Sequence, residues 1–336
     1  MDQILQQPLL FFTVLGIGAV TFVNGWTDAP GAIVSCVSSG AMSLRRAAVM
    51  SAFCNLVGIG VSIAVRPAVT ATVLETVRLP EGEGGLSLAV LLMAVFATVI
   101  WAVGAWYCGL PTSESHGLLA GLSGAASAYS GFACVSLAVW LRVVLGLFLS
   151  LLGGVFLGFA VYGCFNKRKR GGRSSEAPER YEKAALAAGA SAMSAMHGAQ
   201  DGQKMIGLWL LAATLGGGNA VDSYAWAFPC ALLMGGGTLL GGGRIVHTLG
   251  SSLTKTGYRE GIAADLGAAL CLLLLTWFGI PVSTTHTKTA ALIGAGMAGG
   301  RGRVDKGTVI RLVMAWLLTF PACFLLAYGG MRLLLR

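Results

Sequence analysis

The chain has 336 residues, of which 55% are hydrophobic and only 11% are charged, and its mean hydropathy is +0.75. Soluble domains carry about 25% charged residues, so this composition excludes a soluble enzyme, a disordered chain and a secreted disulfide scaffold. It also excludes a nucleic-acid binder, although the net charge is +9. The class that remains is a polytopic membrane protein in contact with a lipid bilayer.

Apolar segments along the chain predict the crossings, because one span needs about 20 apolar residues. The length of the chain allows about ten to twelve transmembrane helices in an all-α protein. In the first half we expect spans near 8–40, 47–66, 87–108, 112–129 and 133–164. In the second half we expect spans near 184–215, 224–240, 261–278, 284–300 and 308–334.

A charged linker at residues 166–183 divides these two sets of spans. Its basic start predicts a cytoplasmic location, because cytoplasmic loops are enriched in Lys and Arg. Five crossings on each side make the second half inverted relative to the first, with both termini external. We therefore expect one transmembrane repeat at 1–165 and an inverted one at 184–336, in a multi-pass protein of the plasma or inner membrane.

One motif in each half places an aspartate beside an amide or hydroxyl in an apolar, Gly/Ala-rich span: NGWTDA at 24–29 and MHGAQDG at 196–202. Placing an acidic side chain in hydrocarbon costs about 2.5–3.5 kcal/mol on insertion scales, so an aspartate inside a span is expected to have a functional or structural role. Hard oxygen ligands suit hard cations, and Na⁺ or H⁺ is the natural companion of an imported anion. The expected cation-coupling residues are Asn24, Thr27, Asp28, Gln200 and Asp201, with Asp28 and Asp201 as the metal ligands if the ion is sodium.

A second motif is also repeated: GLPTSESHG at 109–117 and GIPVSTTHT at 279–287 share Gly, Pro, Ser and His at identical offsets. The interval from the aspartate to the histidine is 88 residues in the first half and 85 in the second. Repeats of this kind, with broken or re-entrant helices, are typical of secondary transporters. The two halves therefore predict an inverted repeat.

Each Pro of the second motif stands just before a hydroxyl-rich helix start. A helix broken in the membrane exposes unpaired N–H groups at its new N-terminus, and these groups and the helix dipole favour an anion. Hydroxyl donors hold an oxyanion less tightly than a bidentate Arg does, so the anion is able to leave. The expected residues around a tetrahedral oxyanion are Ser113, Glu114, Ser115, Ser283, Thr284 and Thr285.

These motifs resemble those of the PiT family of inorganic phosphate transporters, and the resemblance covers almost the whole chain. The segment HGAQDGQK at 197–204 is similar to the second G-A-N-D signature of that family, and PVSTTH at 281–286 to its second serine-threonine motif. The resemblance implies phosphate symport with Na⁺ or H⁺, with phosphate on the Ser/Thr motifs and the cation near the Asp motifs. It also implies a cytoplasmic central loop and external termini.

The chain departs from that family at three positions. Thr27 and Gln200 stand where the family usually has Asn, and Glu114 stands where it usually has Thr. A carboxylate beside phosphate repels it, so one hypothesis is that Glu114 is protonated when the anion binds, which favours proton coupling. The alternative is that Glu114 pairs with Lys204 or Lys288.

Several assignments stay open at this stage. His116, His197 and His286 either brace helices or contact the substrate, and Lys204 and Lys288 either counter a charge or snorkel. The remaining acids fall in the linker, in the external loop or near span ends. Sulfate is an alternative substrate, a channel is a further alternative, and a membrane-embedded hydrolase using Asp28 and Asp201, or His116 with Ser113, is an alternative of another class. Glycine-rich faces permit a homodimer.

Overall fold

The computed structural model describes residues 8–80, 84–170, 179–217, 223–253, 257–300 and 304–336. Within these ranges the chain is helical, apart from turns and an isolated bridge between Val77 and Val135. In the first half the helices are α2 (Pro8–Thr27), α3 (Pro30–Ser38), α4 (Leu44–Val65), α5 (Ala68–Leu74), α6 (Gly84–Tyr107), α7 (Glu114–Ser130), η1 (Phe132–Cys134) and α8 (Leu137–Arg170). In the second half they are α9 (Glu179–Leu215), α10 (Ser223–Leu240), α11 (Gly243–His247), η2 (Thr248–Leu253), α12 (Tyr258–Trp277), α13 (Thr284–Gly299) and α14 (Lys306–Leu334).

Every expected span falls on one helix of the structure, except the first, which falls on two, and the all-α membrane fold is confirmed. Six helical segments of the described chain are long and apolar enough to cross a membrane, or seven if α10 and α11, which bend by 62°, count as one span. The count of ten to twelve is reached only by including helices that fail this test. Among them, α7 and α13 have only 17 and 16 residues and lie inside the bundle.

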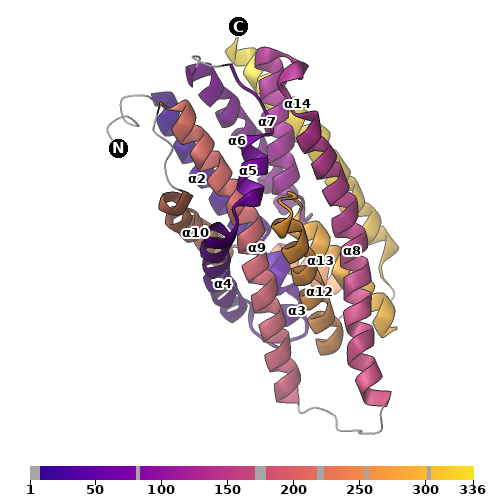
Figure 1. Ribbon diagram of the computed structural model, residues 1–336. Coiled ribbons are helices and arrows are strands. Elements are labelled where there is room, and N and C mark those ends of the chain that lie inside the picture. The colour runs from indigo at the N-terminus through magenta and orange to yellow at the C-terminus, as the bar shows by residue number, and fades with distance from the viewer. Residues whose placement is uncertain (1–7, 81–83, 171–178, 218–222, 254–256, 301–303) are drawn as a thin grey trace.

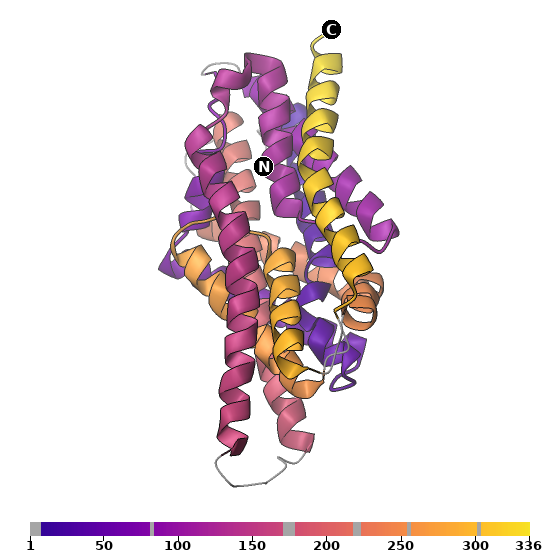
Figure 2. The same cartoon turned by 90° about the vertical axis from the view of Figure 1, so that its right-hand side faces the viewer.

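The helices form an elongated bundle (Figures 1 and 2). The end of α8 and the start of α9 lie at one end of it, whereas the start of α2 and the end of α14 lie at the other (Figure 1). Helix α2 runs away from the end where it starts and α9 runs toward it, so these two helices are antiparallel. The segment around the central linker and the segments near the termini therefore lie at opposite ends.

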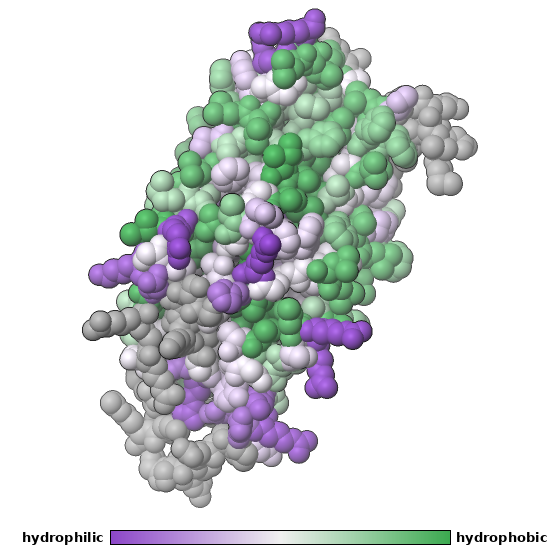
Figure 3. Space-filling view, turned by 180° about the vertical axis from the view of Figure 1, so that it is seen from behind, coloured by the Kyte–Doolittle hydropathy of each residue, from purple (hydrophilic) through white to green (hydrophobic). Residues whose placement is uncertain are grey.

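Apolar side chains cover much of the outer surface (Figure 3), while hydrophilic ones gather at the upper tip and in the lower half of the face shown. On α8, Leu141, Leu152 and Phe156 are 62–69% exposed. Large apolar side chains that are exposed along a long helix are favourable in contact with lipid and unfavourable in contact with water. This surface therefore fits a bilayer.

Glycines set the closest helix crossings, and they do so at matching positions in the two halves. A Cβ at Gly25 would overlap the backbone of Met234 on α10, and a Cβ at Gly198 would overlap the backbone of Asn55 on α4. Both glycines stand three residues before a motif aspartate. Small residues let backbones touch in the membrane, where dispersion replaces the hydrophobic effect.

The first expected span, 8–40, is not one continuous helix. Helix α2 ends at Thr27 and α3 begins at Pro30, so the break falls at Asp28 and Ala29. Proline has no N–H to donate and is tolerated at the first position of a helix, which explains why a new helix starts there. By contrast α9 runs unbroken through Asp201 for 37 residues.

Candidate functional site

Two half-length helices begin at the serines of the repeated Pro-Ser motif. Ser113 is the N-cap of α7 and accepts a hydrogen bond from the backbone N–H of His116 at 3.2 Å. Ser283 caps α13 in the same way, accepting from His286 N–H at 3.3 Å. Such caps satisfy only one of the orphan N–H groups of a helix start. The remaining groups and the dipole make each start attractive to an anion.

These two helix starts meet in the middle of the bundle. Helix α7 runs from the centre toward one end and α13 runs toward the other (Figures 1 and 2). The rings of His116 and His286, each in the first turn of its helix, lie 5.1 Å apart. Ser113, Ser115, Ser283 and Thr285 are all at most 2% exposed. The positive ends of two helix dipoles therefore face a shared, buried region.

Asp28 lies beside these helix starts, at the break between α2 and α3. Its Oδ1 accepts a hydrogen bond from the Thr285 hydroxyl at 2.7 Å, and its Oδ2 accepts from the Asn24 amide at 3.4 Å. The backbone N–H of Glu114 faces the same carboxylate. Thr27 donates to Oε1 of Glu114. We call the group of Asn24, Thr27, Asp28, Glu114 and Thr285 the Asp28 centre.

The Asp28 centre has acceptor oxygens left over. Asn24 Oδ1 and Glu114 Oε2 are buried and find no hydrogen-bond partner among the described residues. Within the same residues, neither carboxylate of this centre forms an ion pair with a lysine or arginine, although Asp28 is 4% and Glu114 2% exposed. Buried carboxylates without a cation are costly. The two carboxylates of this centre therefore lie buried without a balancing cation among the described residues.

Asp201 has the matching place on the other side, and there every carboxylate oxygen has partners. Its Oδ1 accepts from Lys204 Nζ at 2.6 Å and from the Ser115 hydroxyl at 3.3 Å. Its Oδ2 accepts from the Thr284 hydroxyl at 3.1 Å and lies 3.3 Å from His197 Nε2. We call the group of Ser115, His197, Asp201, Lys204 and Thr284 the Asp201 centre.

One contact of each aspartate corresponds in the two centres. The second residue of α7, Ser115, contacts the aspartate of the second half, and the second residue of α13, Thr285, contacts the aspartate of the first half. The amide of Asn24 joins the centres, since it lies 3.4 Å from Asp201 Oδ2 as well as from Asp28. The repeat seen in the sequence is therefore also a repeat of contacts.

Three of the expected residues serve other partners. Gln200 Nε2 donates to the carbonyl of Ile280 at 2.9 Å, and its Oε1 accepts from Thr276 at 3.0 Å, so it braces the segment before α13. His116 stacks on Phe320, with centroids 4.9 Å apart, and His286 lies 4.1 Å from Trp316. These two histidines pack against aromatic rings beside the helix starts.

Neither buried lysine pairs with Glu114, so that alternative is wrong. Lys204 binds Asp201, and Lys288 forms an ion pair with Asp265 while donating to Ser35 at 2.9 Å. Neither lysine snorkels, because they are 1% and 0% exposed.

Asp265 also corrects the expectation that only three acids lie deep in apolar segments, since it is fully buried on α12. Its place near the start of the span 261–278 suggested a position near the surface. The apolar sequence on both sides of Asp265 is the signal that indicates its burial.

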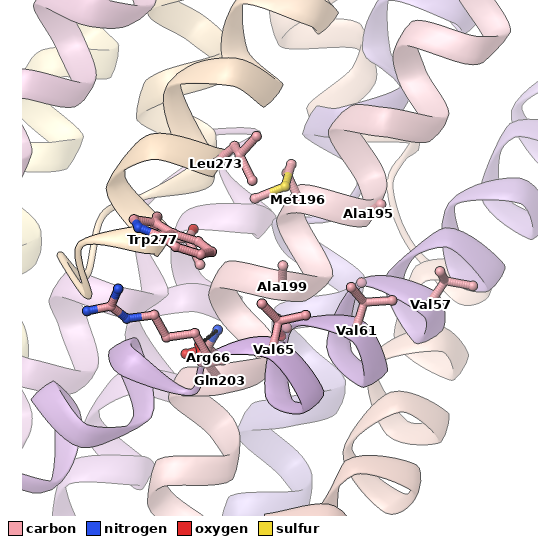
Figure 4. A pocket seen from close by; sticks show the side chains of 13 residues that line it. Val57, Val61, Val65, Arg66, Ala195, Met196, Ala199, Gln203, Leu273 and Trp277 are labelled. Atoms are coloured by element: carbon pink, nitrogen blue, oxygen red, sulfur yellow. Dashed lines mark hydrogen bonds between the residues drawn. The ribbon is translucent and has the colours of Figure 1, made fainter.

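An apolar groove of about 290 Å³ lies elsewhere, between α4, α9 and α12 (Figure 4). Val57, Val61 and Val65 form one wall, and Arg66 lies over the Trp277 ring, 5.3 Å from its centroid. Its almost wholly apolar lining offers little to an oxyanion. The polar chemistry is concentrated at the two helix starts.

Comparison with known proteins agrees with these motifs. The model of the phosphate transporter family matches residues 24–327. The chain belongs to the phosphate transporter family. A Bacillus subtilis protein described as a "probable low-affinity inorganic phosphate transporter" is 30% identical over 93% of this chain and 94% of its own. A Rhizobium meliloti protein of the same description is 31% identical over 97% of both chains.

A solved structure described as "the sodium-dependent phosphate transporter" has the same fold. It superposes with a TM-score of 0.86, covering 98% of this chain and 99% of its own, at 19% sequence identity. The family and these relatives are transporters and not enzymes, so they do not support the hydrolase alternative.

Proposed function

We propose that this protein is a secondary active transporter that carries inorganic phosphate across the cell membrane in symport with Na⁺ or H⁺, by alternating access. The observation that carries this proposal is the meeting of two serine-capped helix starts between two buried aspartates. Membership of the phosphate transporter family supports phosphate as the substrate.

Phosphate would bind between the first turns of α7 and α13. The hydroxyls of Ser113, Ser115, Ser283, Thr284 and Thr285, together with the orphan N–H groups of the two helix starts, supply its hydrogen bonds. Among the described residues, Lys204 is the one basic side chain that forms a hydrogen bond or ion pair with this cluster. Neutral donors and dipoles hold an anion that also has to be released.

The charge of the site requires a companion cation. Asp201 is balanced by Lys204, but Asp28 and Glu114 have no ion-pair partner in the described chain. A phosphate anion adds further negative charge to this buried region. A cation at the Asp28 centre, bound by carboxylate, amide and hydroxyl oxygens, offsets that charge and couples transport to an ion gradient. The structural neighbour is described as sodium-dependent, which favours Na⁺, whereas a Glu114 that is neutral when phosphate binds would favour H⁺.

The two halves, 1–165 and 184–336, would form the inverted repeats that move relative to each other, joined by the linker at 166–183. The antiparallel course of α2 and α9 and the matched contacts of the two aspartates support this division. We infer that the central linker is cytoplasmic and both termini external, in the plasma or inner membrane. The homodimer stays a prediction from glycine-rich faces.

Counterflow of radiolabelled phosphate in proteoliposomes tests the proposal, with Na⁺ and pH gradients imposed separately. We expect labelled phosphate to accumulate in response to at least one gradient. No accumulation under either gradient would overturn the symport. Competition by sulfate addresses the alternative substrate: a phosphate site is expected to retain most of its uptake in tenfold excess of sulfate, and strong inhibition would favour a general oxyanion permease.

A further inference from the structure

The ammonium of Lys204 lies in a cage of oxygens. Its Nζ donates to Asp201 Oδ1 and to the Ser115 hydroxyl, both at 2.6 Å, and to the backbone carbonyl of Val282. The side chain is 1% exposed. A carboxylate, a hydroxyl and a main-chain carbonyl are the hard oxygen ligands with which proteins bind small cations. The ammonium thus stands where a metal cation would otherwise find its ligands.

The corresponding place in the first half has the carboxylate and the hydroxyl but no ammonium. Asp28 takes the place of Asp201 and Thr285 that of Ser115, at 2.7 Å from each other. Lys204 follows Asp201 by three residues, and the residue three after Asp28 is Gly31. A Cβ at Gly31 would meet only Leu249 Cδ1, at 4.0 Å, so the space beside it is open.

The unsatisfied oxygen atoms of the two centres lie on the Asp28 side. Asn24 Oδ1 and Glu114 Oε2, both in the Asp28 centre, find no partner in the described chain. Both carboxylate oxygens of Asp201 are occupied by donors. Two equivalent carboxylates are therefore held in different ways. Asp201 is held by a covalently attached cation, and Asp28 by neutral donors, with unpartnered oxygens on the neighbouring Asn24 and Glu114.

We propose that the Lys204 ammonium permanently occupies a cation-binding position at Asp201. The transporter then binds a mobile cation at the Asp28 centre but none at the Asp201 centre, and it moves one cation fewer per cycle than a protein with two open centres. This inference rests on the proposed function, because it concerns the coupling ion of the same site. It gives Lys204, which the sequence left without a role, a part in setting stoichiometry.

The test removes the ammonium and asks whether Na⁺ takes its place. Thermal unfolding of the purified full chain in detergent is measured without phosphate, over a NaCl series in which choline chloride keeps the ionic strength constant. Lys204→Ser is expected to gain a Na⁺-dependent rise in Tm beyond any rise in wild type, of roughly 2–4 °C at ten times the Kd. The double variant Lys204→Ser with Asp201→Asn is the matched control, because it lacks the carboxylate and is expected to lose that gain.

Two results would overturn the inference: a Na⁺ response of Lys204→Ser equal to that of wild type, or the same gain in the double variant. If Lys204→Ser folds only when Na⁺ is present, the inference is supported. If it fails to fold in both salts while the double variant folds, Na⁺ does not replace the ammonium and the inference is wrong.

A variant of the open centre gives an independent measurement. Asp28→Asn removes the aspartate carboxylate of that centre, and its Tm is expected to lose any Na⁺ dependence that wild type shows, while phosphate counterflow becomes less responsive to an ion gradient. Unchanged Na⁺ dependence and unchanged coupling in this variant would contradict the inference. Because the Tm series contains no phosphate, its outcome is separate from the counterflow assay, so failure of phosphate transport and failure of the Lys204 assignment are distinguishable.

Discussion

Asp28 and Asp201 occupy matching positions, yet the backbone differs at the two sites. The helix that carries Asp28 breaks there, before Pro30, whereas α9 continues through Asp201. Only a continuous helix brings the side chain three residues later onto the same face, and there Lys204 meets Asp201 at 2.6 Å. The same repeated motif therefore gives two different arrangements. Where the helix continues, the aspartate forms a fixed ion pair, and where the helix breaks, the aspartate has no balancing cation.

The largest expected effect comes from removing one carboxylate charge at each centre. Asp201→Asn leaves a buried ammonium without its partner, and breaking a buried ion pair costs about 3–5 kcal/mol in the free energy of unfolding. Asp28→Asn removes a carboxylate that has no lysine partner, so we expect near-wild-type stability with cation-coupled uptake reduced at least about tenfold. Thermal unfolding and counterflow measure the two effects.

Adding Lys204→Met to Asp201→Asn is the control for charge, and it is expected to recover most of the lost stability. Equal destabilisation by Asp28→Asn and Asp201→Asn would show that the two centres do not differ in charge balance.

The close helix crossings at Gly25 and Gly198 provide a second comparison of the two halves, because the same substitution is expected to destabilise both to a similar extent. Gly25→Ala and Gly198→Ala each place a Cβ into the backbone of a neighbouring helix. Overpacking costs about 1–3 kcal/mol, and we expect the upper end because a backbone has little freedom to yield. Gly60→Ala on α4 is the control, since a Cβ there meets nothing within 4 Å. Size-exclusion chromatography in detergent reports the folded fraction, and tolerance of either crossing variant would count against the close contact.

The capping serines are expected to contribute equally to substrate binding. Ser113→Ala and Ser283→Ala each remove a hydroxyl from a helix start, and a hydrogen bond to a charged group is worth about 1.5–3 kcal/mol. We therefore expect the KM for phosphate uptake to rise about tenfold or more in each variant. Ser150→Ala is the control, because that buried hydroxyl bonds the Leu147 carbonyl within α8. A change in only one variant would mean that phosphate sits on one helix start.

The smallest expected effect concerns Glu114, which stands where the second half has Thr284. If its carboxyl is neutral when phosphate binds, uptake by wild type falls as the pH rises, since the carboxylate repels the anion. Glu114→Gln is expected to flatten this dependence several-fold. The ratio of variant to wild-type uptake at each pH removes the titration of phosphate itself, and a constant ratio would exclude Glu114 as the coupling group.

Hydropathy and motif spacing predict most of the helices and the paired helix starts. Pro111 and Pro281 mark both starts because proline cannot continue a helix from the preceding segment. The sequence does not predict that Gln200 braces Ile280 or that Lys288 meets Asp265. These contacts join residues that are 80 and 23 positions apart, and they depend on how the helices pack. The break at Asp28 has a local signal in Pro30, but the expected span ran through it.

The aspartates hold the donors that we assign to the substrate. Thr285 donates to Asp28, and Thr284 and Ser115 donate to Asp201. On the proposed function, phosphate binding would be an exchange of partners, in which an incoming oxyanion takes hydroxyls from carboxylates of the protein. Such an exchange creates few additional hydrogen bonds, so its net free energy is small. The Asp28 carboxylate would lose the hydrogen bond from Thr285 at the same moment, which would leave an oxygen lone pair free for the mobile cation. Binding of the anion would then be linked to binding of the cation through one set of hydroxyl groups.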